Sequence, residues 1–146
     1  MKKLMGSGWV FFFISLYLNP IVQAQTQTPP PQGNHDVWID QMVYFEPGSS
    51  LLTKESKKTL DTLFPMFSYD LAAKLFIEGY TDATESNPGE LSLKRAEVVR
   101  DYFIKKGVSA SRLKVESWGK ERPIRTDDTP EGRMKNRRVD FKVGYP

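Results

Sequence analysis

The sequence contains no cysteine and only one histidine, and this composition excludes several classes of site. Without cysteine there is no disulfide, no thiolate nucleophile or metal ligand, and no residue that could be acylated to give a lipoprotein. The histidine, His35, lies in a Pro/Gln/Thr-rich stretch rather than in a predicted element. Asp127, Asp128 and Glu131 are acids on a predicted loop, where a solvated turn is a simpler interpretation than a hydrolytic carboxylate pair. We therefore expect no catalytic activity, no cofactor, no metal site and no lipid anchor.

A large excess of charge of one sign is also lacking. The 146 residues hold 21 Lys and Arg against 18 Asp and Glu. Lys2 and Lys3 belong to a predicted targeting segment, and removing them leaves 19 basic residues against 18 acidic ones. A charge so close to neutral gives little electrostatic basis for binding a nucleic-acid phosphate backbone. We expect no nucleic-acid partner.

Long apolar runs are lacking as well. The apolar run Trp9–Leu18 stops at Asn19-Pro20, well short of the roughly 20 apolar residues that a membrane-spanning helix needs. A basic start precedes the run, and the small-residue segment Val22–Ala24 follows it. This order is typical of a secretory signal, so we expect residues 1–24 to be a signal peptide cleaved after Ala24. Retention of the segment as an uncleaved anchor is the alternative.

The remaining sequence divides into a tether and one domain. Residues 25–36 form a polar Gln/Thr/Pro tract that includes Pro29–Pro31. Such a tract has too few apolar groups to offset the entropy lost on ordering, and it favours extended polyproline geometry. We expect residues 37–146 to form a single ordered domain, which is long enough to bury a hydrophobic core.

Strand and helix patterns alternate along this domain. Strands are predicted at Met42–Phe45, at Leu75–Ile77 with a stop at Gly79, at Leu113–Trp118 and at Arg138–Val143. Helices are predicted after an N-cap at Thr53, with Pro65 bending or ending the helix, over Ser92–Lys106 with Ser92 as N-cap, and as a short turn over Thr129–Met134. The order β-α-β-α-β-β predicts an α+β sandwich with helices packed on a mixed sheet. The early strands are expected to pair in parallel through the helices, and the last strand is expected to pair locally.

A carboxylate and a guanidinium are predicted to meet at neighbouring element ends. Asp82 follows the second predicted strand, and Arg95 lies near the start of the long helix. Together they could hold a zwitterion, with Asp82 contacting its ammonium group and Arg95 its carboxylate. From the pattern alone, a structural ion pair between the two residues is the simpler interpretation.

Three ordered motifs carry a resemblance to a known family. They are Glu78–Asp82 (EGYTD), Leu91–Ala96 (LSLKRA) and Gly132–Val139 (GRMKNRRV). In these motifs the chain resembles the OmpA C-terminal domain family, and the resemblance extends over most of residues 43–143. It implies a periplasmic domain, associated with the cell wall, that binds peptidoglycan without cleaving it.

The resemblance also implies a ligand and a set of contacts. The ligand is the diaminopimelate residue of the peptidoglycan stem peptide, with Asp82 and Arg95 as the principal contacts. Further contacts are implied for Thr81, Leu91 and Ser92 around the ligand. Arg137 is either a second basic contact or a structural partner of a nearby acid.

The sequence departs from the family pattern in two places. Tyr80 stands where many members carry histidine. The segment from Asp82 to Arg95 is shorter than usual, and Pro88 stands where asparagine is common, with Asn87 adjacent to it. The altered loop keeps a second function open, in which the same fold docks a protein partner in an envelope, secretion or motility assembly.

Overall fold

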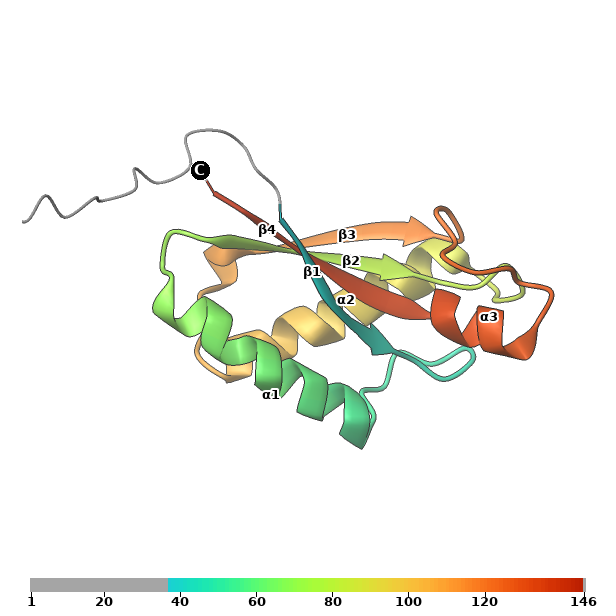
Figure 1. The fold of residues 1–146 in the computed structure, drawn as a ribbon, viewed down its shortest axis with the longest axis horizontal. Coiled ribbons are helices and arrows are strands. Elements are labelled where there is room, and N and C mark those ends of the chain that lie inside the picture. The colour runs from blue at the N-terminus through green and yellow to red at the C-terminus, as the bar shows by residue number, and fades with distance from the viewer. Residues whose placement is uncertain (1–36, 146) are drawn as a thin grey trace, which may run out of the picture. The chain divides into compact units, whose positions relative to one another are not determined.

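The computed structural model describes residues 37–145 as four strands, three α-helices and one 3₁₀ turn (Figure 1). The elements are β1 (Val37–Tyr44), α1 (Lys54–Tyr69), β2 (Lys74–Tyr80), α2 (Pro88–Lys105), η1 (Ala110–Arg112), β3 (Leu113–Gly119), α3 (Pro130–Asn136) and β4 (Arg138–Gly144). The predicted α+β class is confirmed. The predicted signal peptide and tether lie outside the described residues. None of the helices in residues 37–145 combines the length and apolar character required to cross a membrane.

The strands form one mixed sheet in the order β1-β4-β2-β3. The last strand, β4, is antiparallel to both β1 and β2, while β2 and β3 are parallel and are connected through α2. The prediction of local pairing for the last strand is wrong, because β4 crosses the sheet to lie between β1 and β2. Arg138, Val139, Asp140 and Phe141 are all buried, as expected for a central strand that is paired along both of its edges.

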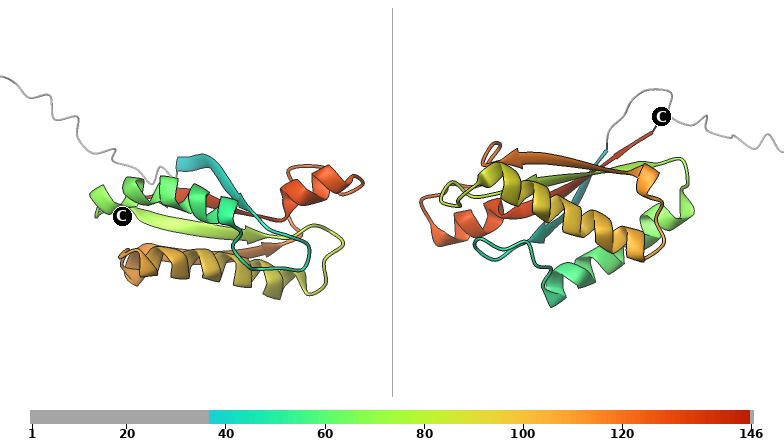
Figure 2. Two further views of the ribbon diagram at one scale, coloured as in Figure 1. Left: turned by 90° about the horizontal axis from the view of Figure 1, so that it is seen from below. Right: turned by 180° about the vertical axis from the view of Figure 1, so that it is seen from behind.

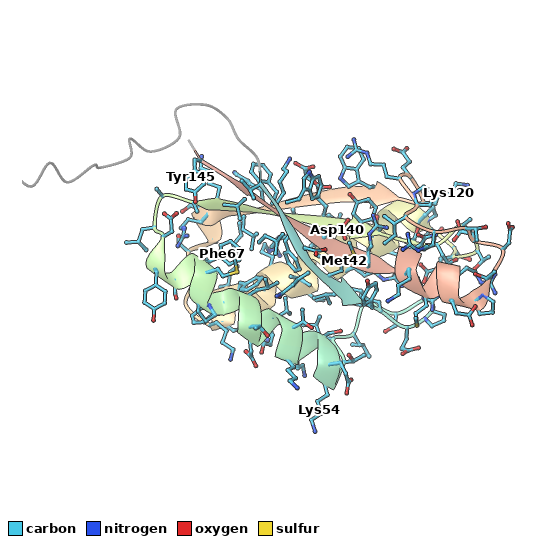
Figure 3. All side chains as sticks on the ribbon, viewed as in Figure 1. Met42, Lys54, Phe67, Lys120, Asp140 and Tyr145 are labelled. Atoms are coloured by element: carbon cyan, nitrogen blue, oxygen red, sulfur yellow. The ribbon has the colours of Figure 1, made fainter. Side chains whose placement is uncertain are left out.

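Helices α1 and α2 cover the same face of the sheet (Figure 2). Their inner side chains and those of the central strands form one hydrophobic core, which includes Leu60, Leu63, Phe67, Leu75, Ile77, Ala96, Val99, Phe103, Val139 and Phe141. Phe103 lies edge-to-face against Phe67 of α1 and Phe141 of β4, with ring centres 6.0 and 6.3 Å apart. Phe67 points from α1 toward the sheet, whereas Lys54 points away from it (Figure 3).

The boundaries of α1 agree with the prediction at its start and differ at its end. The hydroxyl of Thr53 accepts a hydrogen bond from the backbone N–H of Ser56 at 3.0 Å, which confirms the predicted N-cap. The helix continues past Pro65 to Tyr69. Pro65 lies on the exposed side of α1, and the burial of Phe67 in the next turn stabilises the helix beyond it.

Two predicted boundaries are wrong, the start of α2 and the end of β2. The helix begins at Pro88, one turn before the predicted N-cap Ser92, and Asn87 is the capping residue. Proline is well suited to the first helical position, because its fixed φ matches the helix and its missing N–H would be unpaired there in any case. Strand β2 continues through Gly79 to Tyr80 instead of stopping at the glycine.

Gly79 is a point of close approach between β2 and α2. A Cβ atom at Gly79 would lie 1.9 Å from the backbone carbonyl oxygen of Ser92. The hydroxyl of Ser92 also accepts a hydrogen bond from the backbone N–H of Gly119 in β3, at 3.0 Å. The first turns of α2 are thereby held against the carboxyl ends of β2 and β3.

The opposite face of the sheet carries a buried polar cluster. Tyr80 donates a 2.6 Å hydrogen bond to Glu78, and Arg138 donates to Asp140 at 2.9 Å. The Arg138 guanidinium stacks 3.9 Å from the centre of the Tyr80 ring. Burial raises the pKa of Tyr80, with a further increase from Glu78, and burial raises the pKa of Asp140 in spite of Arg138. Tyr80, one of the departures from the family pattern, therefore has its hydroxyl committed to the sheet.

The close approach at Gly79 predicts that adding a single methyl group at this position lowers the stability of the domain. We expect Gly79→Ala to lower the free energy of unfolding by about 1 to 3 kcal/mol, because the helix backbone must move away from the strand. Gly89→Ala is the matched control, since no atom lies within 4 Å of its added Cβ. Urea unfolding followed by circular dichroism measures both variants. Equal stability of the two would contradict the close contact.

Candidate functional site

Four segments that are distant in sequence meet at one end of the sheet. The carboxyl ends of β1 and β2, the start of α2 and the start of β4 all lie there (Figure 1). Phe45, just after β1, and Arg137, just before β4, are joined by a 3.0 Å backbone hydrogen bond from the N–H of Phe45 to the carbonyl of Arg137. Thr81, just after β2, donates its N–H to the carbonyl of Gly119 at 2.8 Å. These contacts fix the loops that carry the predicted site residues.

Arg95 is completely buried at this end of the sheet, with 0% of its surface exposed. Its two Nη atoms donate to both carboxylate oxygens of Glu85, each at 2.7 Å. The same two atoms donate to the backbone carbonyls of Tyr80 at 3.0 Å and Glu46 at 3.2 Å, and Nε donates to the carbonyl of Ser49 at 2.9 Å. A guanidinium has five N–H donors, so every donor of Arg95 already has an acceptor.

Asp82 is also buried, and its partner is Arg137. One carboxylate oxygen accepts from Nη1 of Arg137 at 2.8 Å, and the other accepts from the N–H and the hydroxyl of Thr84 at 2.7 and 2.6 Å. Burial acts to raise the pKa of Asp82, but the hydrogen bonds from Thr84 and Arg137 outweigh it and hold the pKa below its ordinary value. Asp82 is therefore ionised at neutral pH, although it is only 1% exposed.

The ion pair that the sequence pattern favoured, between Asp82 and Arg95, is not formed. Each residue instead binds a different partner, Arg137 for the aspartate and Glu85 for the arginine. Arg137 is the partner of a nearby acid, Asp82, and a ligand contact by Arg137 stays a prediction. Glu85 links the two residues, because it accepts hydrogen bonds from the Arg95 guanidinium and from the backbone N–H of Asp82.

Glu85 is the central residue that the sequence analysis missed. Its carboxylate accepts hydrogen bonds from Arg95 and also from the backbone N–H groups of Gly48, at 2.8 Å, and Asp82, at 3.2 Å. Its side chain is only 3% exposed. One signal could have pointed to it: Glu85 is an acid within the shortened loop between the two motif residues Asp82 and Arg95.

The other predicted contacts lie at different depths around this centre. The hydroxyl of Thr81 is buried and has no hydrogen-bonding partner among the described residues. Leu91 is half-buried and lines a surface cavity. The hydroxyl of Ser92 bonds to Ser117 at 2.6 Å and to the carbonyl of Gly89 at 3.0 Å, so it joins α2 to β3. Ligand contacts by these residues stay predictions.

A cavity of about 490 Å³ opens beside the buried charges. Its lining includes Pro47, Gly48, Thr84, Glu85, Leu91 and Lys94. Lys94 is exposed at its edge and pairs with Glu90 at 2.6 Å. A hollow of this size can hold a small ligand or the end of a peptide. The arrangement is suited to recognising charged groups, and no cluster of three or more potential metal ligands occurs within residues 37–145.

Comparisons with known proteins identify relatives of this chain. A family model described as the OmpA family matches residues 44–137. The sodium-type flagellar protein MotY of Vibrio parahaemolyticus is 37% identical over 106 residues, which cover 70% of this chain and 36% of MotY. The peptidoglycan-associated lipoprotein of Pseudomonas aeruginosa is 35% identical over 104 residues, which cover 68% of this chain and 60% of the lipoprotein. The chain thus spans less than two thirds of the length of either relative.

A solved structure shares the fold as well. The C-terminal domain of MotB from Helicobacter pylori superposes with a TM-score of 0.68 at 25% identity, covering 73% of this chain and 85% of the MotB domain. The two relatives are named as a flagellar protein and a peptidoglycan-associated lipoprotein, and neither name is that of an enzyme, in agreement with the prediction of no catalytic activity. From the matched residues and the shared fold, the chain is a member of the OmpA family.

Proposed function

We propose that this protein binds peptidoglycan non-covalently, through the free amino-acid end of a diaminopimelate residue in the stem peptide. The observation that carries the proposal is that a buried guanidinium, Arg95, and a buried, ionised aspartate, Asp82, both contact Glu85 on the wall of an open cavity. The relative from Pseudomonas aeruginosa is named as peptidoglycan-associated, which supports the same ligand class. We further propose that the protein is exported to the periplasm, where this polymer lies.

The chemistry of diaminopimelate fits these residues. Its free end carries an ammonium group and a carboxylate on one carbon atom. The planar fork of Arg95 matches a carboxylate through two parallel hydrogen bonds, and Asp82 provides the negative charge for the ammonium group. Thr81 adds a buried hydroxyl without a partner among the described residues, directly before Asp82 in the chain. Leu91 lies on the cavity wall, and its proposed role is to contact the apolar part of a stem peptide.

One observation favours a second candidate function. Because Glu85 and three carbonyls already occupy every donor of Arg95, the site as it stands has no free guanidinium to offer a ligand. A domain that kept this closed arrangement permanently would serve as a docking module for an envelope protein. Binding to purified cell wall separates the two candidates.

Wall binding should depend on both buried charges. We expect the purified protein to sediment with insoluble diaminopimelate-containing peptidoglycan, and Asp82→Asn and Arg95→Lys to bind about tenfold more weakly or worse, since each removes a charge-assisted hydrogen bond. Arg100→Gln, on the exposed side of the same helix, is the matched control and should bind as the wild type does. Circular dichroism confirms that each variant is folded.

The composition of the wall provides a second comparison in the same experiment. Peptidoglycan with lysine in place of diaminopimelate lacks the carboxylate assigned to Arg95, and should bind more weakly. Failure of the folded wild type to sediment with either wall would contradict peptidoglycan binding and favour the docking function.

The role of Asp82 as an ionised group predicts a dependence of stability on pH. Its folded-state pKa lies below its unfolded value, so its stabilisation is present above about pH 4 and is lost as the pH falls through the folded pKa. At pH 7, Asp82→Asn should lower the free energy of unfolding by about 3 kcal/mol, because Arg137 loses its buried partner. Urea unfolding at pH 7 and pH 3 should show this difference shrinking in acid.

Asp101→Asn is the control for this measurement, since Asp101 is exposed on α2. It should leave stability unchanged at both pH values. A difference between wild type and Asp82→Asn that is equal at pH 7 and pH 3 would mean that Asp82 contributes by packing and not by charge.

A further inference from the structure

The contacts of Glu85 are those expected for a bound carboxylate. Four N–H donors converge on it: two from Arg95 at 2.7 Å, one from the backbone of Gly48 at 2.8 Å and one from the backbone of Asp82 at 3.2 Å. Both carboxylate oxygens are engaged in the bidentate geometry that a guanidinium forms with a carboxylate ligand. These four donors therefore define a carboxylate-binding position, and an internal side chain fills it.

We propose that Glu85 is a specificity-determining residue of this site, which admits a carboxylate only when a neighbouring ammonium group arrives with it. The proposal rests on the proposed function, because it concerns the ligand that the same site selects. Glu85 competes with any ligand carboxylate for the fork of Arg95. As part of the same chain, it competes at a high effective concentration and excludes simple carboxylates from solution.

The neighbouring charges explain why an amino-acid end can succeed where a simple carboxylate cannot. The site contains two ion pairs, Arg95 with Glu85 and Arg137 with Asp82. A hydrogen bond from the backbone N–H of Asp82 to the carboxylate of Glu85 connects the two pairs. A ligand carboxylate can only replace the contacts of Glu85. A zwitterion also brings a cation for Asp82, which adds an interaction that Glu85 itself does not provide. The site therefore selects a zwitterion over a simple carboxylate, because only the zwitterion gains the additional interaction with Asp82.

The cavity provides a place for the displaced side chain. Glu85 already lies on the wall of the 490 Å³ hollow, which opens to solvent and includes Lys94. Moving the carboxylate of Glu85 into this hollow returns it to water and places it near a cation. The loop that carries Glu85, residues 81–87, is anchored at Thr81 by the hydrogen bond to Gly119, while Ser86 and Asn87 are exposed.

Chemical rescue tests the carboxylate position without any wall polymer. Glu85→Ala leaves four converging donors unpaired, so we expect a lower melting temperature than that of the wild type. Sodium acetate should restore part of the lost stability to Glu85→Ala and should have no such effect on the wild type. Sodium chloride at equal concentration controls for ionic strength, and Glu90→Ala controls for loss of an exposed acid near the same cavity. Acetate that stabilises Glu85→Ala no more than chloride does would overturn the inference.

Ligand selectivity tests the role of Glu85 directly. We expect the wild type to be stabilised by meso-diaminopimelate but not by glutarate, which has carboxylates and no ammonium group. Glu85→Ala should respond to both compounds and should bind diaminopimelate-containing peptidoglycan at least about tenfold more tightly than the wild type. If the wild type sediments with the wall, binding by a folded Glu85→Ala that is no tighter than that of the wild type would overturn the inference.

The acetate-rescue experiment and the wall-binding experiment together separate this inference from the proposed function. If acetate rescues Glu85→Ala while neither protein sediments with peptidoglycan, the carboxylate position is supported and the proposed function fails. Glu85→Gln provides a second variant in case Glu85→Ala does not fold, because the amide keeps the shape of the side chain and removes its charge. It too should bind the wall more tightly than the wild type, and weaker or equal binding would count against the inference.

Discussion

The burial of the Arg95 guanidinium is the constraint on which this end of the domain depends. An arginine side chain remains charged in proteins, so its complete burial requires an acceptor for each N–H and a negative partner. The acceptors come from the loop after β1, from the end of β2 and from Glu85 in the following loop. One side chain on α2 therefore holds three separate segments in place. Removing the acid alone would leave a buried charge unpaired, at a cost of about 3 to 5 kcal/mol in similar buried pairs.

The second ion pair, between Arg137 and Asp82, is also buried and holds the last strand to the same end of the sheet. Arg137 precedes β4 and binds Asp82 after β2, and it also donates from Nε to the carbonyl of Phe45 at 3.1 Å. The two cations and two anions of the site sum to zero charge. A zwitterionic ligand also has no net charge, so it can enter without leaving an excess of either sign in a buried place. This neutrality distinguishes the site from a basic surface patch, whose affinity falls steeply with salt.

Local patterns predicted much of this structure, and long-range pairing explains what they missed. The helix that follows the cap at Thr53 depends on residues within a few positions of one another, and the cap was predicted correctly. The position of β4 between β1 and β2 depends on contacts between distant segments, which strand patterns do not encode. Similarly, the motifs identified Asp82 and Arg95, but the acid that binds Arg95 is determined by how the loop folds back. Asp82, the acid at the end of the first motif, was therefore assigned as the partner of Arg95 in place of Glu85.

The direction of β1 determines how the domain would respond to mechanical force. The strand begins at Val37, opposite Val143, and ends at Tyr44, opposite Arg138 and next to the site. A pull on Val37, with the site held fixed, acts along the strand and loads the β1–β4 ladder in shear. In shear the hydrogen bonds resist together, whereas a pull across the strands would separate them one at a time. The antiparallel pairing of β1 and β4 thus gives the domain a resistant axis between Val37 and the end of the sheet that carries Asp82 and Arg95.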